Sequence, residues 1–112
     1  MERAFESHLD MAKAEIASAD GISLPMVAAN LKACLANAFH FVKPSNVALA
    51  AAEDVEVAFR SLVIEIGKTP LGMGRSAGVD NAKRLVTQRL DILRADLSNC
   101  PPSEEARALG ID

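Results

Sequence analysis

The sequence predicts an all-α protein: an antiparallel four-helix bundle that ends in a short C-terminal helical turn. Half of the 112 residues are hydrophobic, and much of that half is alanine and leucine, which favour helices. Along four segments, apolar residues recur at steps of three and four, the spacing of one helix face. No segment alternates apolar and polar residues as a half-buried strand does. Four amphipathic helices with short connections pack best as an antiparallel bundle, and residues 1–112 suffice for a single helical domain with one core.

The first two helices are expected over residues 2–19 and 24–42. Asp20-Gly21 separates them, and Gly21 is expected to end the first helix in the left-handed conformation, because glycine has no Cβ to hinder it. Ser23 fits the N-cap position of the second helix. The apolar face of the first helix consists of Phe5, Leu9, Ala12 and Ile16. The face of the second consists of Leu24, Val27, Leu31, Cys34 or Leu35, Ala38 and Phe41.

The third helix is expected to begin at Pro44 or Ser45 and to continue to about residue 66. Lys43 precedes a proline, which disfavours helical backbone at Lys43 and therefore separates the second helix from the third. The last part, "LVIEIG", is rich in β-branched residues, but the helical spacing continues through it and favours a helix. The apolar face consists of Ala48, Ala51, Val55, Phe59, Leu62 and Ile66.

Residues 67–78 are predicted to form the one long loop, because four of them are glycine and one is proline. The fourth helix is expected over residues 79–98. Ser103 precedes two glutamates and is expected to cap a last helical turn that continues to about Leu109. The apolar face of the fourth helix consists of Val79, Ala82, Val86, Leu90, Leu93 and Leu97.

The net charge of −3 argues against a general affinity for nucleic acids. The charge is uneven, because residues 60–94 hold seven basic and three acidic side chains, and such polarity can orient a partner. A few cations on an acidic protein predict only weak, salt-sensitive binding to phosphates. A nucleic-acid-binding accessory protein is therefore one alternative function, although nucleic acid is an unlikely partner on these grounds. The cations concerned are Lys83, Arg84, Arg89 and Arg94.

The sequence predicts no catalytic residues and no cofactor, because no acid–base pair and no nucleophile arrangement occurs at a recognisable spacing. Neither His8 nor His40 has a partner at metal-ligand spacing and no CxxC is present, so no metal is expected. The longest apolar region, residues 24–42, is interrupted by polar side chains, which argues against a membrane span. The N-terminus is charged from its second residue and lacks a signal-peptide core. We therefore expect a cytoplasmic protein that is not an enzyme.

One short motif has a resemblance to a known family. Residues 40–45 read "HFVKPS", in which His40 precedes Lys43 by three residues on a predicted helix. This spacing resembles that of histidine phosphotransfer domains, which are small helical bundles. The resemblance implies that His40 would carry a phosphoryl group and that Lys43 would help to neutralise it, so a phosphorelay carrier is the second alternative. Pro44 departs from the family pattern, which has a small residue there and a helix that continues.

The function that the sequence favours is a non-enzymatic helical protein–protein interaction module. Its partner is a protein, and we expect self-association as a homodimer. The reason is that apolar residues outside the four stripes exceed what a bundle of this size needs to bury. We expect an apolar interface on the third and fourth helices, rimmed by arginines. The predicted interface consists of Val57, Arg60, Val63, Ile64, Arg84, Leu85, Arg89 and Ile92.

Overall fold

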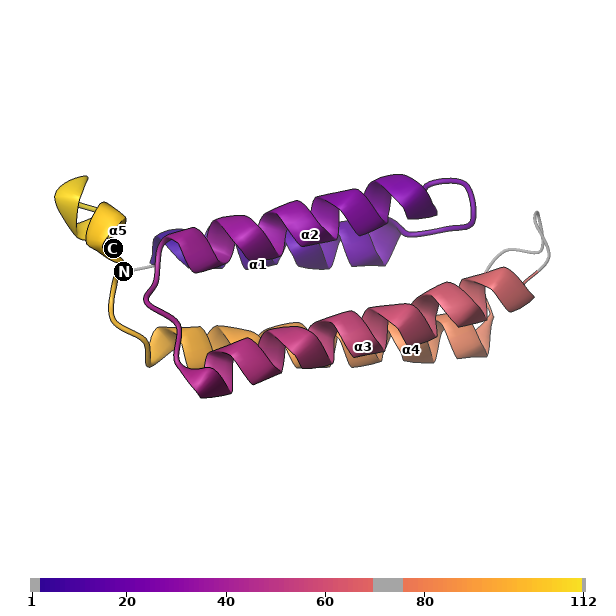
Figure 1. The fold of residues 1–112 in the computed structure, drawn as a ribbon. Coiled ribbons are helices and arrows are strands. Elements are labelled where there is room, and N and C mark those ends of the chain that lie inside the picture. Colours follow the sequence, from indigo (N-terminus) through magenta and orange to yellow (C-terminus); the bar gives the residue numbers. More distant parts are fainter. Residues whose placement is uncertain (1–2, 70–75, 112) are drawn as a thin grey trace.

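A computed structural model describes residues 3–69 and 76–111 and confirms the all-α prediction (Figure 1). The described residues contain no strand; a single β-bridge joins Val42 to Pro102. No helix among them is both long and apolar enough to cross a bilayer. The described helices are α1 (Ala4–Ser18), α2 (Leu24–His40), α3 (Asn46–Lys68), α4 (Ala77–Ser98) and α5 (Glu104–Ala108).

The four long helices form two antiparallel hairpins that lie against each other (Figure 1). Helix α1 pairs with α2, α3 pairs with α4, and contacts between α1 and α4 join the hairpins. Helix α5 lies across one end of the bundle, near the N-terminus (Figure 1). The molecule measures 49 × 22 × 21 Å, so it is only two helices wide, and each long helix keeps an outer face in water.

Serine side chains fix the starts of three helices. The hydroxyl oxygens of Ser45, Ser76 and Ser103 each accept a hydrogen bond of 3.1 Å from the backbone N–H three residues ahead. Each bond satisfies one of the N–H groups that a helix leaves unpaired in its first turn. The predicted cap Ser103 is therefore confirmed, and Ser45 caps α3 where the sequence predicted the helix to begin at Pro44 or Ser45. Helix α4 begins at Ala77, two residues before the predicted start, because Ser76 supplies the cap.

The turn between α1 and α2 differs from the prediction. Helix α1 ends at Ser18, and Gly21 does not have a positive φ angle. The carboxylate of Asp20 instead accepts hydrogen bonds from the N–H groups of Ile22 (3.0 Å) and Ser23 (2.7 Å). Ser23 occupies the N-cap position of α2 without a capping side-chain bond. The prediction was wrong here because a side chain of the turn, rather than glycine geometry, satisfies the backbone.

Helix α3 continues to Lys68, through the β-branched segment and past Gly67. Gly67 and Lys68 are therefore helical, as are Ala77 and Gly78 at the other side of the predicted loop. The rest of that loop, residues 70–75, lies outside the described residues. The predicted end of this helix, at about residue 66, lies two residues before the observed end, because glycine weakens a helix but does not forbid it.

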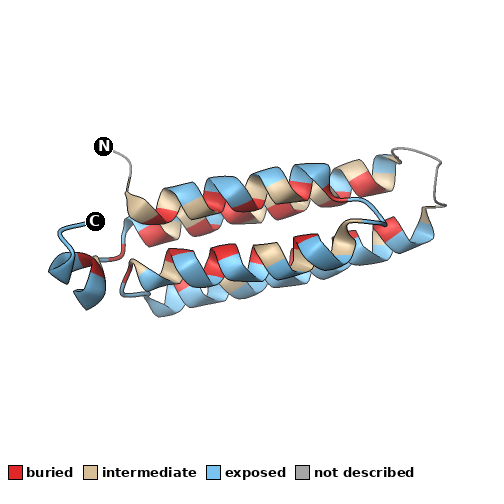
Figure 2. Cartoon of the chain, turned by 90° about the horizontal axis from the view of Figure 1, so that it is seen from above, coloured by how far each residue is buried: buried red, intermediate tan, exposed pale blue. Residues whose placement is uncertain are grey.

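The buried residues form one cluster between the hairpins, as the buried positions in Figure 2 show. The predicted apolar faces of α1 and α4 are fully buried, and no charged or polar residue among those described is buried. In α2 both Cys34 and Leu35 are buried. In α3 the core position is Ala58, and Phe59 is only partly buried beside it.

Charged side chains of α4 bind the two hairpins together. Asp91 pairs with Lys13 of α1, and Arg94 pairs with Asp10. The Lys83 ammonium donates a hydrogen bond of 2.9 Å to the carbonyl oxygen of Ala17. Two of the four basic residues that the sequence places on this helix therefore serve contacts within the chain.

Candidate interaction surface

The outer face of α3 carries a row of exposed apolar side chains. Val57 and Ile64 keep 54% and 59% of their area in water. Both lie on the side of α3 opposite its buried residues, and Ala50 precedes Val57 on the same line. These three residues recur every seven positions, which keeps them on one line of a helix. We call Ala50, Val57 and Ile64 the α3 outer row.

A groove runs beside this row, between α3 and α2. Its volume is about 490 Å³. On the α2 side the groove is lined by the small residues Ala28 and Ala29, and on the α3 side by Phe59, whose side chain is only partly buried. Val63 and Leu49 lie on the same flank of α3 by helical spacing, and both are exposed. The groove is lined by Ala28, Ala29, Leu31, Lys32, Leu35, Glu56, Phe59 and Arg60.

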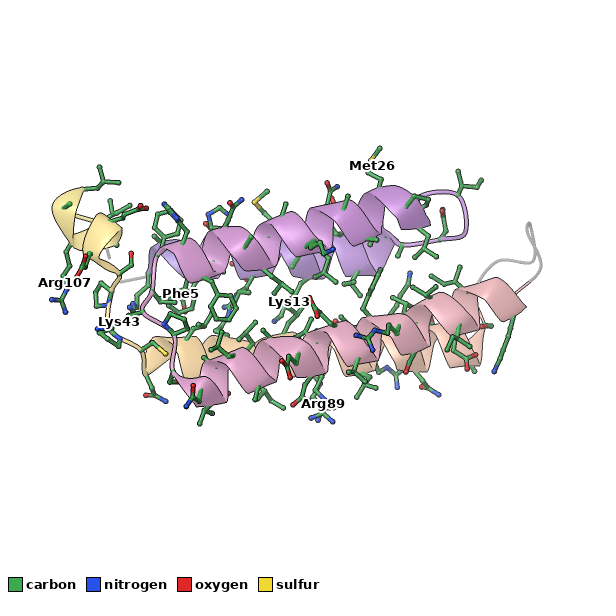
Figure 3. The ribbon with its side chains drawn as sticks, viewed as in Figure 1. Phe5, Lys13, Met26, Lys43, Arg89 and Arg107 are labelled. Carbon is green, nitrogen blue, oxygen red and sulfur yellow. The ribbon has the colours of Figure 1, made fainter. Side chains whose placement is uncertain are left out.

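Three predicted interface residues of α4 form a second row. Leu85, Arg89 and Ile92 recur at steps of four and three, so they share one flank of α4. Leu85 packs against the core, while Ile92 is 41% exposed. Arg89 extends away from α1 and α2 (Figure 3). This row lies on the flank of α4 away from α1, beside α3, its main helical contact.

Arg84 lies apart from the other predicted interface residues. It lines a hollow of about 450 Å³ between α1 and α4, together with Ile16, Ala17 and Lys83. Asp80 and Asp91 line the same hollow, so the positive charge there is balanced locally. The structure therefore brings Val57, Arg60, Val63 and Ile64 together on α3, places Leu85, Arg89 and Ile92 on the neighbouring helix, and separates Arg84.

The charges of α3 are unevenly distributed along its length. Three acidic residues, Glu53, Asp54 and Glu56, precede Val57, whereas Arg60, Glu65 and Lys68 follow it. Lys68 pairs with Glu65 at 3.5 Å. Among the described residues, Glu53, Glu56 and Arg60 make no ion pair or side-chain hydrogen bond. Glu56 and Arg60 lie four residues apart but form no ion pair in the described structure, so both side chains are free to meet charges of another molecule.

The phosphate-carrier candidate His40 is the last residue of α2. Its Nε2 lies 2.5 Å from the Oε2 atom of Glu105 in α5. Its own carbonyl oxygen accepts a hydrogen bond of 2.8 Å from the Ser103 hydroxyl. A carboxylate at the imidazole repels a phosphoryl group, and the negative end of the helix dipole does the same.

Lys43 lies near His40 at the end of the bundle, and its backbone is hydrogen-bonded to the C-terminal segment. The Lys43 N–H donates to the carbonyl oxygen of Pro101 at 2.9 Å. The two residues line a hollow of about 570 Å³ with Arg107, and both Glu104 and Glu105 line it too. Figure 3 shows Lys43 and Arg107 at this end. The hollow therefore mixes cations with carboxylates, and its geometry gives no support to phosphate binding.

The remaining side chains that could react, those of His8, Cys34 and Cys100, pack against other parts of the chain. His8 stacks on Phe41, with ring centroids 5.6 Å apart. Cys34 and Cys100 are both buried free thiols, and burial, with a smaller effect of Glu15, raises the pKa of Cys34. Within residues 3–69 and 76–111, no cluster of three His, Cys, Asp or Glu side chains could hold a metal ion.

Arg3 has a role that sequence reasoning missed. Its guanidinium donates hydrogen bonds to the carbonyl oxygens of Leu97, Ser98 and Cys100, at 2.9–3.2 Å. It thereby caps the C-terminus of α4, where a cation is favourable. No local signal could have found this contact, because the partners lie more than ninety residues away in sequence.

Comparisons with known proteins add no candidate: no family model, curated protein or solved structure matches this chain. The α3 outer row and the adjoining groove are therefore assessed from their own geometry.

Proposed function

We propose that this chain is a non-enzymatic helical interaction module that binds a second copy of itself. The observation that carries the proposal is the α3 outer row, in which Val57 and Ile64 are each more than half exposed. Single exposed apolar residues are ordinary on protein surfaces. Helices that pack in pairs do so through apolar residues at two positions of each heptad; the α3 outer row supplies one of these positions, and Glu53 and Arg60 occupy the other.

The energy available from this surface suits a weak, reversible complex. Fully covering a valine or isoleucine side chain stabilises by about 1.5–3 kcal/mol relative to leaving it exposed. Val57 and Ile64 are half covered already, so the four side chains of two copies contribute roughly half of that each. The loss of free motion on association costs about 4–15 kcal/mol, which is comparable to or larger than the roughly 3–6 kcal/mol from these four side chains. A dimer therefore also has to cover Val63 and Phe59, which lie beside the row.

The test is the molar mass in solution over a concentration series, by light scattering and sedimentation equilibrium. We expect the wild-type mass to rise from monomer toward dimer below about 1 mM, the Kd that corresponds to about −4.1 kcal/mol. Ile64→Glu should remain monomeric, because a dimer would bury a carboxylate. Met26→Glu is the matched control, since Met26 is 68% exposed on α2, off this surface. A wild-type chain that stays monomeric throughout would refute the proposal.

A further inference from the structure

The charge order of α3 specifies how two copies would pair. We propose that the α3 helices pair antiparallel about a two-fold axis at Val57, so that Arg60 of each copy meets Glu53 of the other. This inference rests on the proposed self-association and adds its geometry. It is carried by three observations: the exposed outer row, the positions of Glu53 before and Arg60 after Val57, and the absence of partners for Glu53 and Arg60 within the described chain.

The apolar residues match in this arrangement. When two helices are antiparallel about an axis at Val57, a residue a given number of positions after Val57 faces the residue the same number before it. Val57 therefore meets Val57 of the second copy, and Ile64 meets Ala50. A large side chain against a small one lets two helices approach closely and interdigitate.

The charges match in the same register. Glu53, Glu56 and Arg60 recur at steps of three and four, so they share one flank of α3. The two-fold axis brings this flank against the same flank of the other copy. Arg60, three positions after the axis, then lies level with position 54, between Glu53 and Glu56. The offsets along the helix are about 1.5 and 3 Å, at 1.5 Å per residue.

A parallel pair would reverse this complementarity. It would place Glu53 beside Glu53 and Arg60 beside Arg60, and like charges that face each other destabilise a helix pair. It would also set Ala50 against Ala50, which leaves a gap in the seam. Charge and packing thus favour the same antiparallel arrangement.

Disulfide trapping tests the geometry. The Cα atoms of the two Val57 residues would lie about 3.4–5.4 Å apart, from an axis separation of 8–10 Å and a helix radius of 2.3 Å. A disulfide spans Cα distances of about 4.4–6.8 Å. Val57→Cys should therefore form a covalent dimer under mild oxidation. Ile64→Cys should not, because those positions lie about 21 Å apart along the helix. Mixing Ala50→Cys with Ile64→Cys should give a mixed dimer.

The two native cysteines are buried, so the oxidised wild type is the blank. Covalent dimers from both Val57→Cys and Ile64→Cys would indicate a parallel pair and overturn the antiparallel arrangement. A wild-type chain that dimerises, with no trapping at position 57, would also overturn it while leaving self-association intact. A wild type that stays monomeric refutes the proposed function itself, so the two failures are distinguishable.

Charge reversal gives an independent readout. Glu53→Arg and Arg60→Glu should each weaken self-association roughly three- to thirtyfold, because both symmetric pairs become repulsive. An equal mixture of the two variants should recover dimers, since every facing pair is then opposite in sign. Failure of the mixture to associate more tightly than either variant alone would contradict the assigned register.

Discussion

Asp20 decides the turn between α1 and α2, and its carboxylate is the group with the clearest consequence for stability. Hydrogen bonds from Ser23, above all from its backbone N–H, lower the pKa of Asp20 below its ordinary value. A group whose pKa is lower in the folded state than in the unfolded chain stabilises the fold while it is ionised. That contribution is present above the unfolded pKa and is lost as the pH falls through the folded pKa.

We expect Asp20→Asn to lower the free energy of unfolding at pH 7, and the difference from wild type to shrink as the pH falls below about 3.9, the ordinary value for aspartate. Urea unfolding at a series of pH values and one low protein concentration measures it. Asp54→Asn is the control, because Asp54 accepts no hydrogen bond among the described residues. A difference at Asp20 that stays constant with pH would contradict this explanation.

Single residues were predictable where the signal is local and not where it depends on distant partners. Ser103 was predicted as a cap, and the start of α3 was predicted within two residues, because a cap lies next to the helix that it begins. The prediction of a left-handed Gly21 was wrong because the Asp20 carboxylate accepts hydrogen bonds from two backbone N–H groups of the turn, and this arrangement needs no left-handed residue. The contact of His40 with Glu105 joins residues that are 65 positions apart, and no rule based on sequence spacing predicts it.

Ser103 joins α5 to the end of α2, and its removal should loosen that end of the bundle. The hydroxyl donates to the carbonyl oxygen of His40 and accepts from the N–H of Ala106. Loss of an N-cap costs about 0.5–2 kcal/mol. In Ser103→Ala we expect the amides of α5 to exchange with solvent roughly three- to thirtyfold faster, measured by hydrogen exchange. Ser98→Ala, which removes only a bond to Arg94, should leave that exchange unchanged.

At the scale of elements, helix type was predictable and helix length less so. The six buried positions of α4 match the predicted stripe because the spacing of apolar residues follows directly from helical geometry. The β-branched end of α3 is helical because Leu62 and Ile66 are buried on the continuing face, and packing outweighs intrinsic preference. Helix ends depend on caps and on weak preferences, so the observed ends differ from the predicted ends by up to two residues.

Gly67 is a weak point of α3 that substitution should remove. It lies within the helix, its φ angle is not positive, and a Cβ built there meets nothing within 4 Å. Alanine loses less conformational freedom on folding than glycine does. We expect Gly67→Ala to raise the free energy of unfolding by about 0.4–1 kcal/mol, measured by urea denaturation.

Gly110 provides the contrast for that measurement. Its φ angle of 70° lies in the left-handed region, which strains any residue with a Cβ. Gly110→Ala should therefore give no stabilisation. An equal gain at both positions would show that the reasoning about backbone conformation is wrong.

At the scale of the whole molecule, the narrow bundle explains why apolar residues remain outside. Two hairpins enclose one cluster of buried residues between them, and the far side of each helix stays in water (Figure 2). The sequence predicted apolar residues outside the four stripes, and the four interface residues that it placed on α3 remain a prediction. It could not separate Arg84 from them, because the choice between neighbouring helix faces depends on how the hairpins pack.

Self-association would couple the stability of the chain to its concentration. A partner that binds the folded state and not the unfolded chain raises the melting temperature by mass action. We expect the Tm of the wild type to rise with protein concentration in the range where the dimer forms. The Tm of Val57→Glu should stay constant with concentration, because the charge removes the contact at the proposed axis. The core is untouched in this variant, since Val57 is exposed.

Raising the salt concentration should reduce the dependence of the wild-type Tm on protein concentration. The Debye length falls from about 10 Å at 0.1 M to 3 Å at 1 M, so salt screens exposed pairs such as Glu53 with Arg60. Calorimetry at several concentrations and two salt levels measures both effects, and a wild-type Tm as constant as that of the variant would exclude a dimer tied to this face of α3.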